Sequence, residues 1–75
     1  MTAIEMFEKL GYECKHIKQC ICYRKIDYSF MRIVAEIKFD LKKRIYYCEC
    51  GMAIRIPNKK EKEAIQRQCE ELGWI

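Results

Sequence analysis

The residues of this chain that are best suited to chemistry are six cysteines and one histidine among 75 residues. Four of the cysteines form two Cys-X-Cys pairs, and in a strand the two sulfur atoms of such a pair point to the same side. Thiolate and imidazole groups are the ligands that tetrahedral zinc prefers. The pattern therefore suggests one structural zinc ion, and the candidate ligands are Cys14, His16, Cys20, Cys22, Cys48 and Cys50.

One candidate ligand set lies within a single predicted hairpin. A three-residue loop over residues 17–19 would place His16 opposite Cys20. The same register would place Cys14 opposite Cys22. Paired residues of two antiparallel strands share a face, so this register predicts a compact Cys₃His site.

The rival set is a Cys₄ site that joins Cys20 and Cys22 to Cys48 and Cys50. A one-residue gap on an extended strand spreads the two sulfur atoms of each pair, which weakens both ligand sets. The alternative interpretation is that Cys48, Cys50 and Cys69 are small buried hydrophobic side chains, because cysteine is among the most buried residue types. Both interpretations stay open at this point.

Nucleophilic catalysis has less support in the sequence. A thiolate at Cys14 or Cys20 activated by His16 would also need a third group that orients the imidazole. The sequence contains no glycine-rich phosphate loop, and a 9.1 kDa chain leaves little room for a deep cleft. We therefore expect a protein without enzymatic activity.

The composition predicts one folded domain over residues 1–75. Hydrophobic residues make up 51% of the chain, which is enough to form a core and argues against disorder. No apolar run reaches the roughly 18 to 20 residues of a membrane span, and the N-terminal residues lack the basic and apolar regions of a signal peptide. We expect the chain to stay in the cytoplasm, where its cysteines are reduced rather than paired in disulfides.

Both ends of the chain predict an amphipathic helix. Each begins with the spacing of a capping box, formed by Thr2 with Glu5 and by Asn58 with Glu61. Apolar residues then recur at helical spacing. They are Ala3, Met6, Phe7 and Leu10 in the first helix, and Ala64, Ile65, Cys69 and Leu72 in the second. A glycine suited to positive φ and an aromatic residue end each segment, as Gly11-Tyr12 and Gly73-Trp74.

The middle of the chain predicts strands. Residues 31–39 alternate between apolar and polar, which is typical of a strand with one buried face. Residues 12–17 and 20–26 predict a first hairpin, and residues 44–50 continue through a bend or bulge into 52–56. The expected fold is therefore α+β, with an antiparallel sheet of about four strands, flanked in sequence by an N-terminal and a C-terminal helix that pack on one face.

The sheet region is basic. Between residues 12 and 56 there are ten Lys and Arg residues and five Asp and Glu residues. With several tyrosines nearby, the open sheet face could hold nucleic acid through phosphate contacts and stacking. The alternative is an ordinary solvated strand face. Because Tyr and Arg often anchor interfaces, we expect partner contacts at Arg24, Lys25, Lys42, Lys43, Arg44, Tyr46 and Tyr47.

Both ends of the chain also carry a family resemblance. Four segments resemble small proteins encoded by phages and prophages of Gram-positive bacteria. They are Thr2-Ala3 with residues 5–12, residues 21–25, residues 63–65 and residues 68–74. Several small accessory phage proteins of this kind inhibit host defence, including anti-CRISPR proteins. The resemblance implies a bacterial host cytoplasm as the setting, and it supplies no active-site residues. The cysteine-rich strands depart from the family pattern.

Together these observations predict a non-catalytic binding protein that inhibits a host defence nuclease. Its expected partner is a CRISPR effector or the guide complex of that effector. A protein that imitates DNA should be acidic. Because this chain has a formal net charge of +4, we expect it to bind a protein surface or guide RNA instead. The alternative is a small nucleic-acid-binding accessory protein of a phage or prophage, with or without a stabilising zinc ion.

Overall fold

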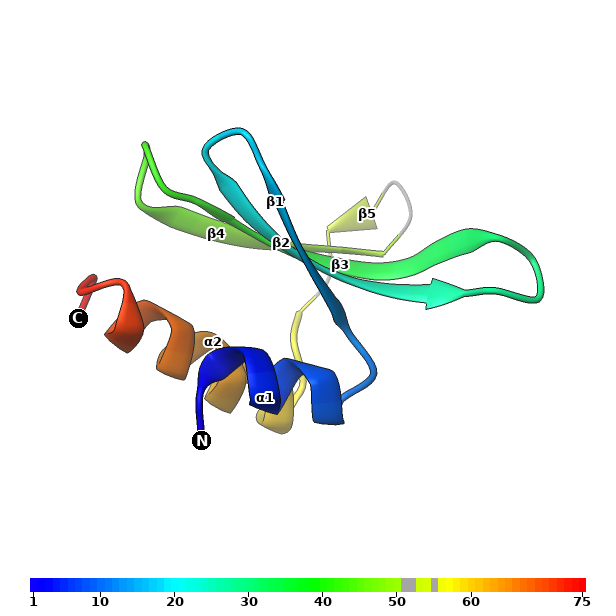
Figure 1. Ribbon diagram of the computed structural model, residues 1–75, viewed down its shortest axis with the longest axis horizontal. Coiled ribbons are helices and arrows are strands. Elements are labelled where there is room, and N and C mark those ends of the chain that lie inside the picture. The colour runs from blue at the N-terminus through cyan, green and yellow to red at the C-terminus, as the bar shows by residue number, and fades with distance from the viewer. Residues whose placement is uncertain (51–52, 55) are drawn as a thin grey trace.

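The computed structural model describes residues 1–50, 53–54 and 56–75, without the side chains of Cys50, Ala53 and Ile54. Two helices and a single antiparallel sheet form an α+β fold, as the sequence predicted (Figure 1). The elements are α1 (Ala3–Lys9), β1 (Glu13–Ile17), β2 (Cys20–Asp27), β3 (Arg32–Asp40), β4 (Ile45–Cys50), β5 (Ala53–Ile54) and α2 (Lys59–Glu71).

The sheet is a simple meander in which each strand pairs antiparallel with the next, in the order β1-β2-β3-β4-β5. The four longer strands match the expected sheet. Both helices lie below the sheet in Figure 1 and cover one face. We call this covered side the helix face and the opposite side the open face. The arrangement buries the apolar stripe of each helix against one side of the strands.

The capping residues at both helix N-termini act as the sequence indicates. The Thr2 hydroxyl accepts a hydrogen bond from the Glu5 N–H at 3.2 Å, and the Asn58 side chain accepts one from the Glu61 N–H at 2.8 Å. Each glutamate in turn accepts a bond from the backbone N–H of its capping residue, which completes two capping boxes.

The two helices also end alike. Gly11 and Gly73 have φ of +92° and +74°, a region that disfavours residues with a Cβ atom. After each glycine the chain turns back. The Tyr12 N–H donates to the Phe7 carbonyl at 3.0 Å, and the Trp74 N–H donates to the Cys69 carbonyl at 2.9 Å. The prediction of a positive φ at both helix C-termini is confirmed.

An aromatic cluster forms the centre of the core. Phe7 stacks on Tyr23 with ring centroids 3.8 Å apart, and Phe39 meets both rings edge to face. Ile37 beside them is fully buried. Two buried hydrogen bonds join the core to α2: the Tyr23 hydroxyl donates to the Gln68 side chain, and the Tyr12 hydroxyl donates to the Glu61 carboxylate. These hydrogen bonds satisfy groups that would be costly to bury alone.

Two parts of the strand prediction were wrong. The chain does not continue past a bend after β4, because β5 pairs antiparallel with β4 and the chain direction reverses. The alternation expected over residues 31–39 buries Ala35, Ile37 and Phe39 but leaves Met31 and Ile33 at 78% and 43% exposure. These two residues belong to the β2–β3 hairpin, which extends past the helices (Figure 1).

Candidate functional site

The strand register separates the candidate metal ligands onto two faces. The β1–β2 turn has two residues, Lys18 and Gln19, because Ile17 pairs with Cys20. His16 therefore lies opposite Ile21, and not opposite Cys20 as a three-residue loop would require. The hairpin register that the Cys₃His set needs was wrong by one residue, and a one-residue shift moves side chains to the other face.

The consequence for the thiols follows from the pairing across the sheet. Cys14 pairs with Tyr23, and the Tyr23–Ile37–Cys48 row places Cys48 on the same helix face. Cys22 pairs with Lys38 on the open face, and Cys20 shares that face as its i−2 neighbour. Neither the Cys₃His nor the Cys₄ set comes together within one chain. The Cys50 side chain lies outside the described residues.

The described thiols are mostly packed as small apolar groups. Cys22, Cys48 and Cys69 are buried, and burial raises the pKa of Cys14, Cys22 and Cys69 above its ordinary value. Protonated thiols are poor nucleophiles and poor metal ligands. In the described part of the chain, no three His, Cys, Asp or Glu side chains are grouped closely enough to hold a metal ion.

Acidic side chains interrupt the open face. Arg24 forms an ion pair with Glu36, and the Lys38 ammonium lies 3.7 Å from the same carboxylate. The hydrogen bond to Glu36 raises the pKa of Arg24. Glu13 of β1 and Glu49 of β4 lie in the same cross-strand row, on either side of the Arg24–Glu36 pair. An anionic backbone laid along this face would meet carboxylates at its centre, which disfavours the face as a phosphate-binding surface.

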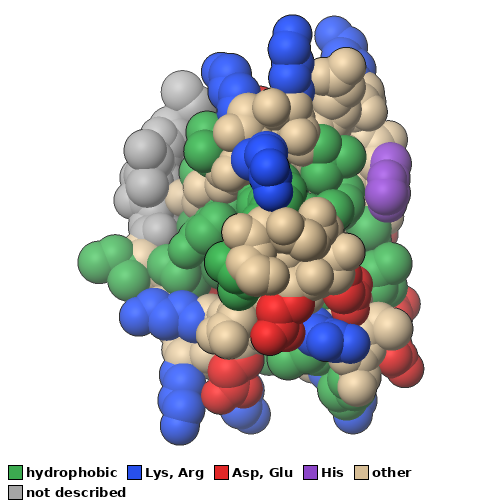
Figure 2. Space-filling model, turned by 90° about the vertical axis from the view of Figure 1, so that its left-hand side faces the viewer, with side chains coloured by type: hydrophobic (Ala, Val, Ile, Leu, Met, Phe, Trp, Pro, Cys, Tyr) green, Lys and Arg blue, Asp and Glu red, His purple; other side chains and the backbone are tan. Residues whose placement is uncertain are grey.

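The basic side chains gather instead at the end of the sheet where two turns meet. The Leu41 N–H donates to the Gln19 carbonyl at 2.9 Å, which fixes the β3–β4 turn beside the β1–β2 turn. Lys18 and Lys42 flank a shallow hollow that Gln19 and Leu41 also line. Figure 2 looks toward this end and shows Lys and Arg side chains along its top, with acidic side chains in the lower half. We call Lys18, Lys42, Lys43 and Arg44 the basic end.

The β3–β4 turn is held in one conformation. The Asp40 carboxylate accepts hydrogen bonds from the N–H groups of Lys42 and Lys43 at 3.1 and 3.0 Å. Arg44 has a φ of +59°, and its guanidinium donates to the Gly73 carbonyl at 3.2 Å. Among the described residues, the ammonium groups of Lys18, Lys42 and Lys43 make no ion pair. These three cations are therefore available to an anionic partner.

The seven predicted contact residues do not form one surface. Lys42, Lys43 and Arg44 lie together in the basic end, while Arg24 and Tyr47 lie on the open face. Tyr46 is on the helix face, where its ring lies 5.8 Å from that of Phe39. Lys25 also faces the helix side, with its ammonium 4.9 Å from the centre of the Tyr12 ring.

Lys18 was not among the contact residues predicted from the sequence. The predicted hairpin over residues 12–17 and 20–26 already placed Lys18 in its turn, as the structure has it. The turn carries no Asn-Gly or Asp-Gly signal, and Lys18 itself adopts a positive φ of 53°. What the sequence did not reveal is the Gln19–Leu41 hydrogen bond, which brings the Lys18 turn beside the β3–β4 turn.

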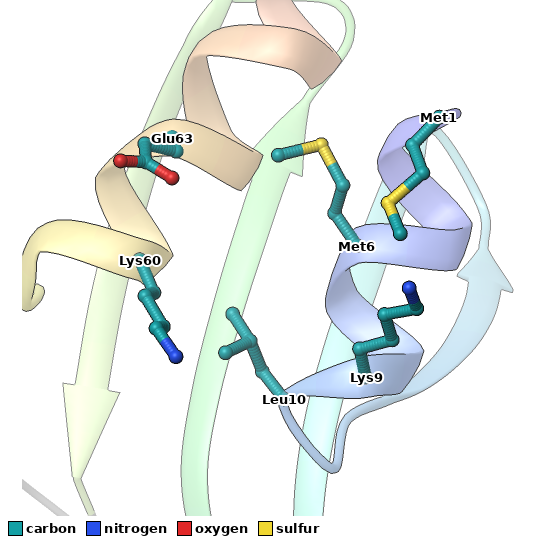
Figure 3. Close-up of a pocket in the computed structure, with 6 residues that line it drawn as sticks. All are labelled: Met1, Met6, Lys9, Leu10, Lys60 and Glu63. Carbon is teal, nitrogen blue, oxygen red and sulfur yellow. The ribbon is translucent and has the colours of Figure 1, made fainter.

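A separate hollow of about 220 Å³ lies between the two helices (Figure 3). Met6 of α1 and Leu10, which directly follows α1, point toward α2, where Lys60 and Glu63 line the hollow. Met1 and Lys9 complete the lining. This lining contains no thiol, hydroxyl or imidazole group. The hollow offers an apolar surface with charged rims.

None of the described helices has the length and apolar content needed to cross a lipid bilayer. Comparison with known proteins gives no match to a protein-family model, to a curated protein or to a solved structure.

Proposed function

We propose that this chain is a non-catalytic phage-encoded protein that inhibits a host defence nuclease of the CRISPR effector class. In this proposal the basic end contacts the effector or its guide complex. The main observation behind the proposal is that two turns, joined by the Gln19–Leu41 hydrogen bond, bring four cationic residues together. These residues are Lys18, Lys42, Lys43 and Arg44. The family resemblance of the two chain ends supplies the biological setting.

The charge distribution supports a compact contact rather than a long track of nucleic acid. Strand-long binding of phosphates would require the open face, and there Glu36 and Glu49 lie opposite each other. The basic end is small, so it suits a few phosphates or carboxylates at one place. A guide-loaded effector presents RNA phosphates beside protein surface, and such a composite surface fits a small cationic contact.

The turn that carries Lys42 and Lys43 is ordered before binding. Asp40 fixes both backbone N–H groups, and Arg44 ties the turn to the end of α2. A contact that is already ordered loses less conformational entropy when it binds. This order favours a specific interface over a flexible basic tail.

A second candidate function is that of a small nucleic-acid-binding accessory protein. The unpaired cations of the basic end favour it, because lysine ammonium groups are general phosphate contacts. The tyrosines argue against it, since Tyr46 and Tyr47 lie on opposite faces and cannot form one stacking platform.

A cleavage assay tests the proposal. Purified wild-type chain is added in increasing amounts to a guide-loaded CRISPR effector from a Gram-positive host, and cutting of plasmid DNA is followed. The proposal expects inhibition that approaches completion near one chain per effector. It also expects no shift of free duplex DNA or free RNA at the same concentrations. Uninhibited cleavage, combined with a strongly salt-dependent shift of free nucleic acid, would favour the accessory protein.

A further inference from the structure

Among the residues that the structure describes, three large and strongly exposed side chains lie together in the β2–β3 hairpin. Tyr28, Phe30 and Met31 are 61%, 74% and 78% exposed, and we call these three residues the apolar tip. In Figure 1 the hairpin projects to the right, past the end of α1. Exposed apolar groups gathered at one place typically mark an interaction surface.

The apolar tip is ordered by its own contacts. The Asp27 carboxylate accepts a hydrogen bond from the Ser29 N–H at 3.0 Å, and the Tyr28 hydroxyl donates to the Glu13 carboxylate. Met31 has a φ of 51°, which turns the chain at the tip. The Arg32 guanidinium lies 5.7 Å from the centre of the Phe30 ring. These contacts hold the exposed side chains in place before any partner binds.

The charges around the apolar tip indicate the chemistry of the partner. At the base of the hairpin Glu13 pairs with Arg24 and Asp27 pairs with Arg32, and Arg24 is also ion-paired with Glu36, so the neighbourhood has no cluster of unpaired cations. A site for an anionic membrane would carry several cations beside its apolar groups, and so would a site for phosphates. The tip instead combines the exposed Phe30 and Met31 side chains and the exposed Tyr28 ring with one adjacent cation, Arg32, which matches an apolar protein pocket with a carboxylate at its rim.

The apolar tip and the basic end occupy opposite ends of the same two strands. β2 begins at the basic end with Cys20, which pairs with Asp40, and it ends at the hairpin with Asp27. At about 3.3 Å per residue, the eight residues of β2 separate the two ends by roughly 25 Å. A rigid body of this kind can touch two chemically different surfaces of one partner at once.

We propose that the apolar tip inserts into an apolar pocket on the nuclease polypeptide while the basic end contacts a second, anionic region of the same complex. This inference rests on the proposed function and adds a protein pocket to it. Phe30 and Met31 fill the pocket, and Arg32 meets a carboxylate at its rim. The tip is convex, so it requires a concave partner surface.

The test is the affinity for a guide-loaded CRISPR effector, measured for wild-type chain and for the double variant Phe30→Ser with Met31→Asn. Asparagine tolerates positive φ, so the hairpin turn should persist. The matched control is Ile56→Ser with Ile75→Ser, which removes apolar side chains of 84% and 75% exposure elsewhere. Thermal melts of both variants should match the wild type, because none of the four side chains is buried.

The proposal expects the tip variant to lose affinity by about tenfold or more, while the control binds like the wild type. Wild-type affinity in the tip variant would overturn this inference and leave the proposed function standing. If the wild-type chain binds no effector, the proposed function and this inference fall together.

Two further measurements test whether the apolar tip binds a second copy of the chain or a membrane instead of a protein pocket. Sedimentation at rising protein concentration reports self-association, and flotation with vesicles containing anionic lipid reports membrane binding. Either behaviour, if the tip variant abolishes it and the control does not, would overturn the protein-pocket assignment.

Discussion

The guanidinium of Arg44, at the end of the β3–β4 turn, donates a hydrogen bond to the carbonyl oxygen of Gly73 just after α2, at 3.2 Å. This bond joins two parts of the chain that are far apart in sequence, and it sets where the basic end sits relative to the helices. Arg44 therefore has a structural contact, while Lys42 and Lys43 present their charges to solvent.

Arg44→Asn should lower the unfolding free energy by about 0.5 to 1.5 kcal/mol, because it removes this hydrogen bond while asparagine tolerates the positive φ. Lys43→Asn in the same turn serves as the control and should leave the unfolding free energy nearly unchanged. Urea unfolding curves measure both. Equal curves for Arg44→Asn and Lys43→Asn would show that the Gly73 contact contributes nothing.

Gly73→Val should destabilise the chain by about 1 to 3 kcal/mol, because a β-branched residue is strained at a φ of +74°. A Cβ atom at this position would meet no atom within 4 Å, so the cost comes from the backbone and not from a clash. Gly73→Asn should cost much less, since asparagine accepts the left-handed region. Similar melting temperatures for the valine and asparagine variants would remove the strain argument.

Stability should fall as the pH rises above the ordinary pKa values of cysteine and tyrosine. Burial raises the pKa of Tyr23, Cys22 and Cys69 in the folded chain, so the folded state keeps protons that the unfolded state loses. This contribution is complete below the unfolded pKa values of 9.0 for cysteine and 10.0 for tyrosine, and it is lost as the pH rises through the folded values.

The variant Tyr23→Phe separates the contribution of Tyr23 to the pH dependence of stability from that of the cysteines. The variant should lose about 1 to 3 kcal/mol at neutral pH, because it leaves the buried Gln68 oxygen without its donor. Its stability should then fall less steeply above pH 10 than that of the wild type. Urea unfolding at neutral pH and at a series of alkaline pH values checks both effects. If the unfolding free energies of the wild type and Tyr23→Phe fall equally with rising pH, the buried Tyr23 hydroxyl does not contribute to the pH dependence.

A strong zinc chelator should leave the melting temperature unchanged. The strand register puts Cys22 on the open face and Cys14 and Cys48 on the helix face, so the described residues bring neither predicted ligand set together. Elemental analysis of protein from zinc-supplemented cells should give much less than one zinc per chain. A stoichiometric zinc ion whose removal lowers the melting temperature would contradict the observed register.

Local signals predicted much of the fold. The capping boxes at Thr2 and Asn58, the glycines after each helix and the helical spacing of apolar residues depend only on near neighbours in sequence. Such signals survive in a single sequence. The helix–sheet–helix order and the α+β class follow from them directly.

The sequence predicted the candidate site less well, because the site depends on pairing between strands. A loop of two residues instead of three moves His16 from a position opposite Cys20 to one opposite Ile21. The sequence of the turn gives no strong preference between these lengths. Lys18 was missed because a contact between two distant turns, the Gln19–Leu41 hydrogen bond, brings it beside the β3–β4 turn. Tyr46 and Tyr47 were grouped although adjacent strand residues face opposite sides.

The exposed hairpin also had no local signal. Apolar alternation continues through Met31 and Ile33, so the sequence cannot show where the helices stop covering the strand. Coverage depends on the length and placement of α1 and α2, which are properties of the packed molecule.

The affinity of the chain for a guide-loaded CRISPR effector most directly tests whether the basic end binds that complex. It is measured at about 0.15 M salt, a physiological ionic strength. Lys42→Glu with Lys43→Glu reverses two charges of the basic end. Lys59→Glu with Lys62→Glu makes the same change in net charge on the exposed side of α2 and serves as the control. A third variant, Lys42→Gln with Lys43→Gln, removes the charges without adding carboxylates beside Asp40.

We predict that charge reversal at Lys42 and Lys43 lowers the affinity for the effector by about tenfold or more. The affinity of the glutamine variant should lie between those of the charge-reversal variant and the wild type. The α2 control should bind with the affinity of the wild type. Equal losses in the basic-end variant and the α2 control would reduce the effect to net charge alone. Undiminished binding by the basic-end reversal would contradict the account.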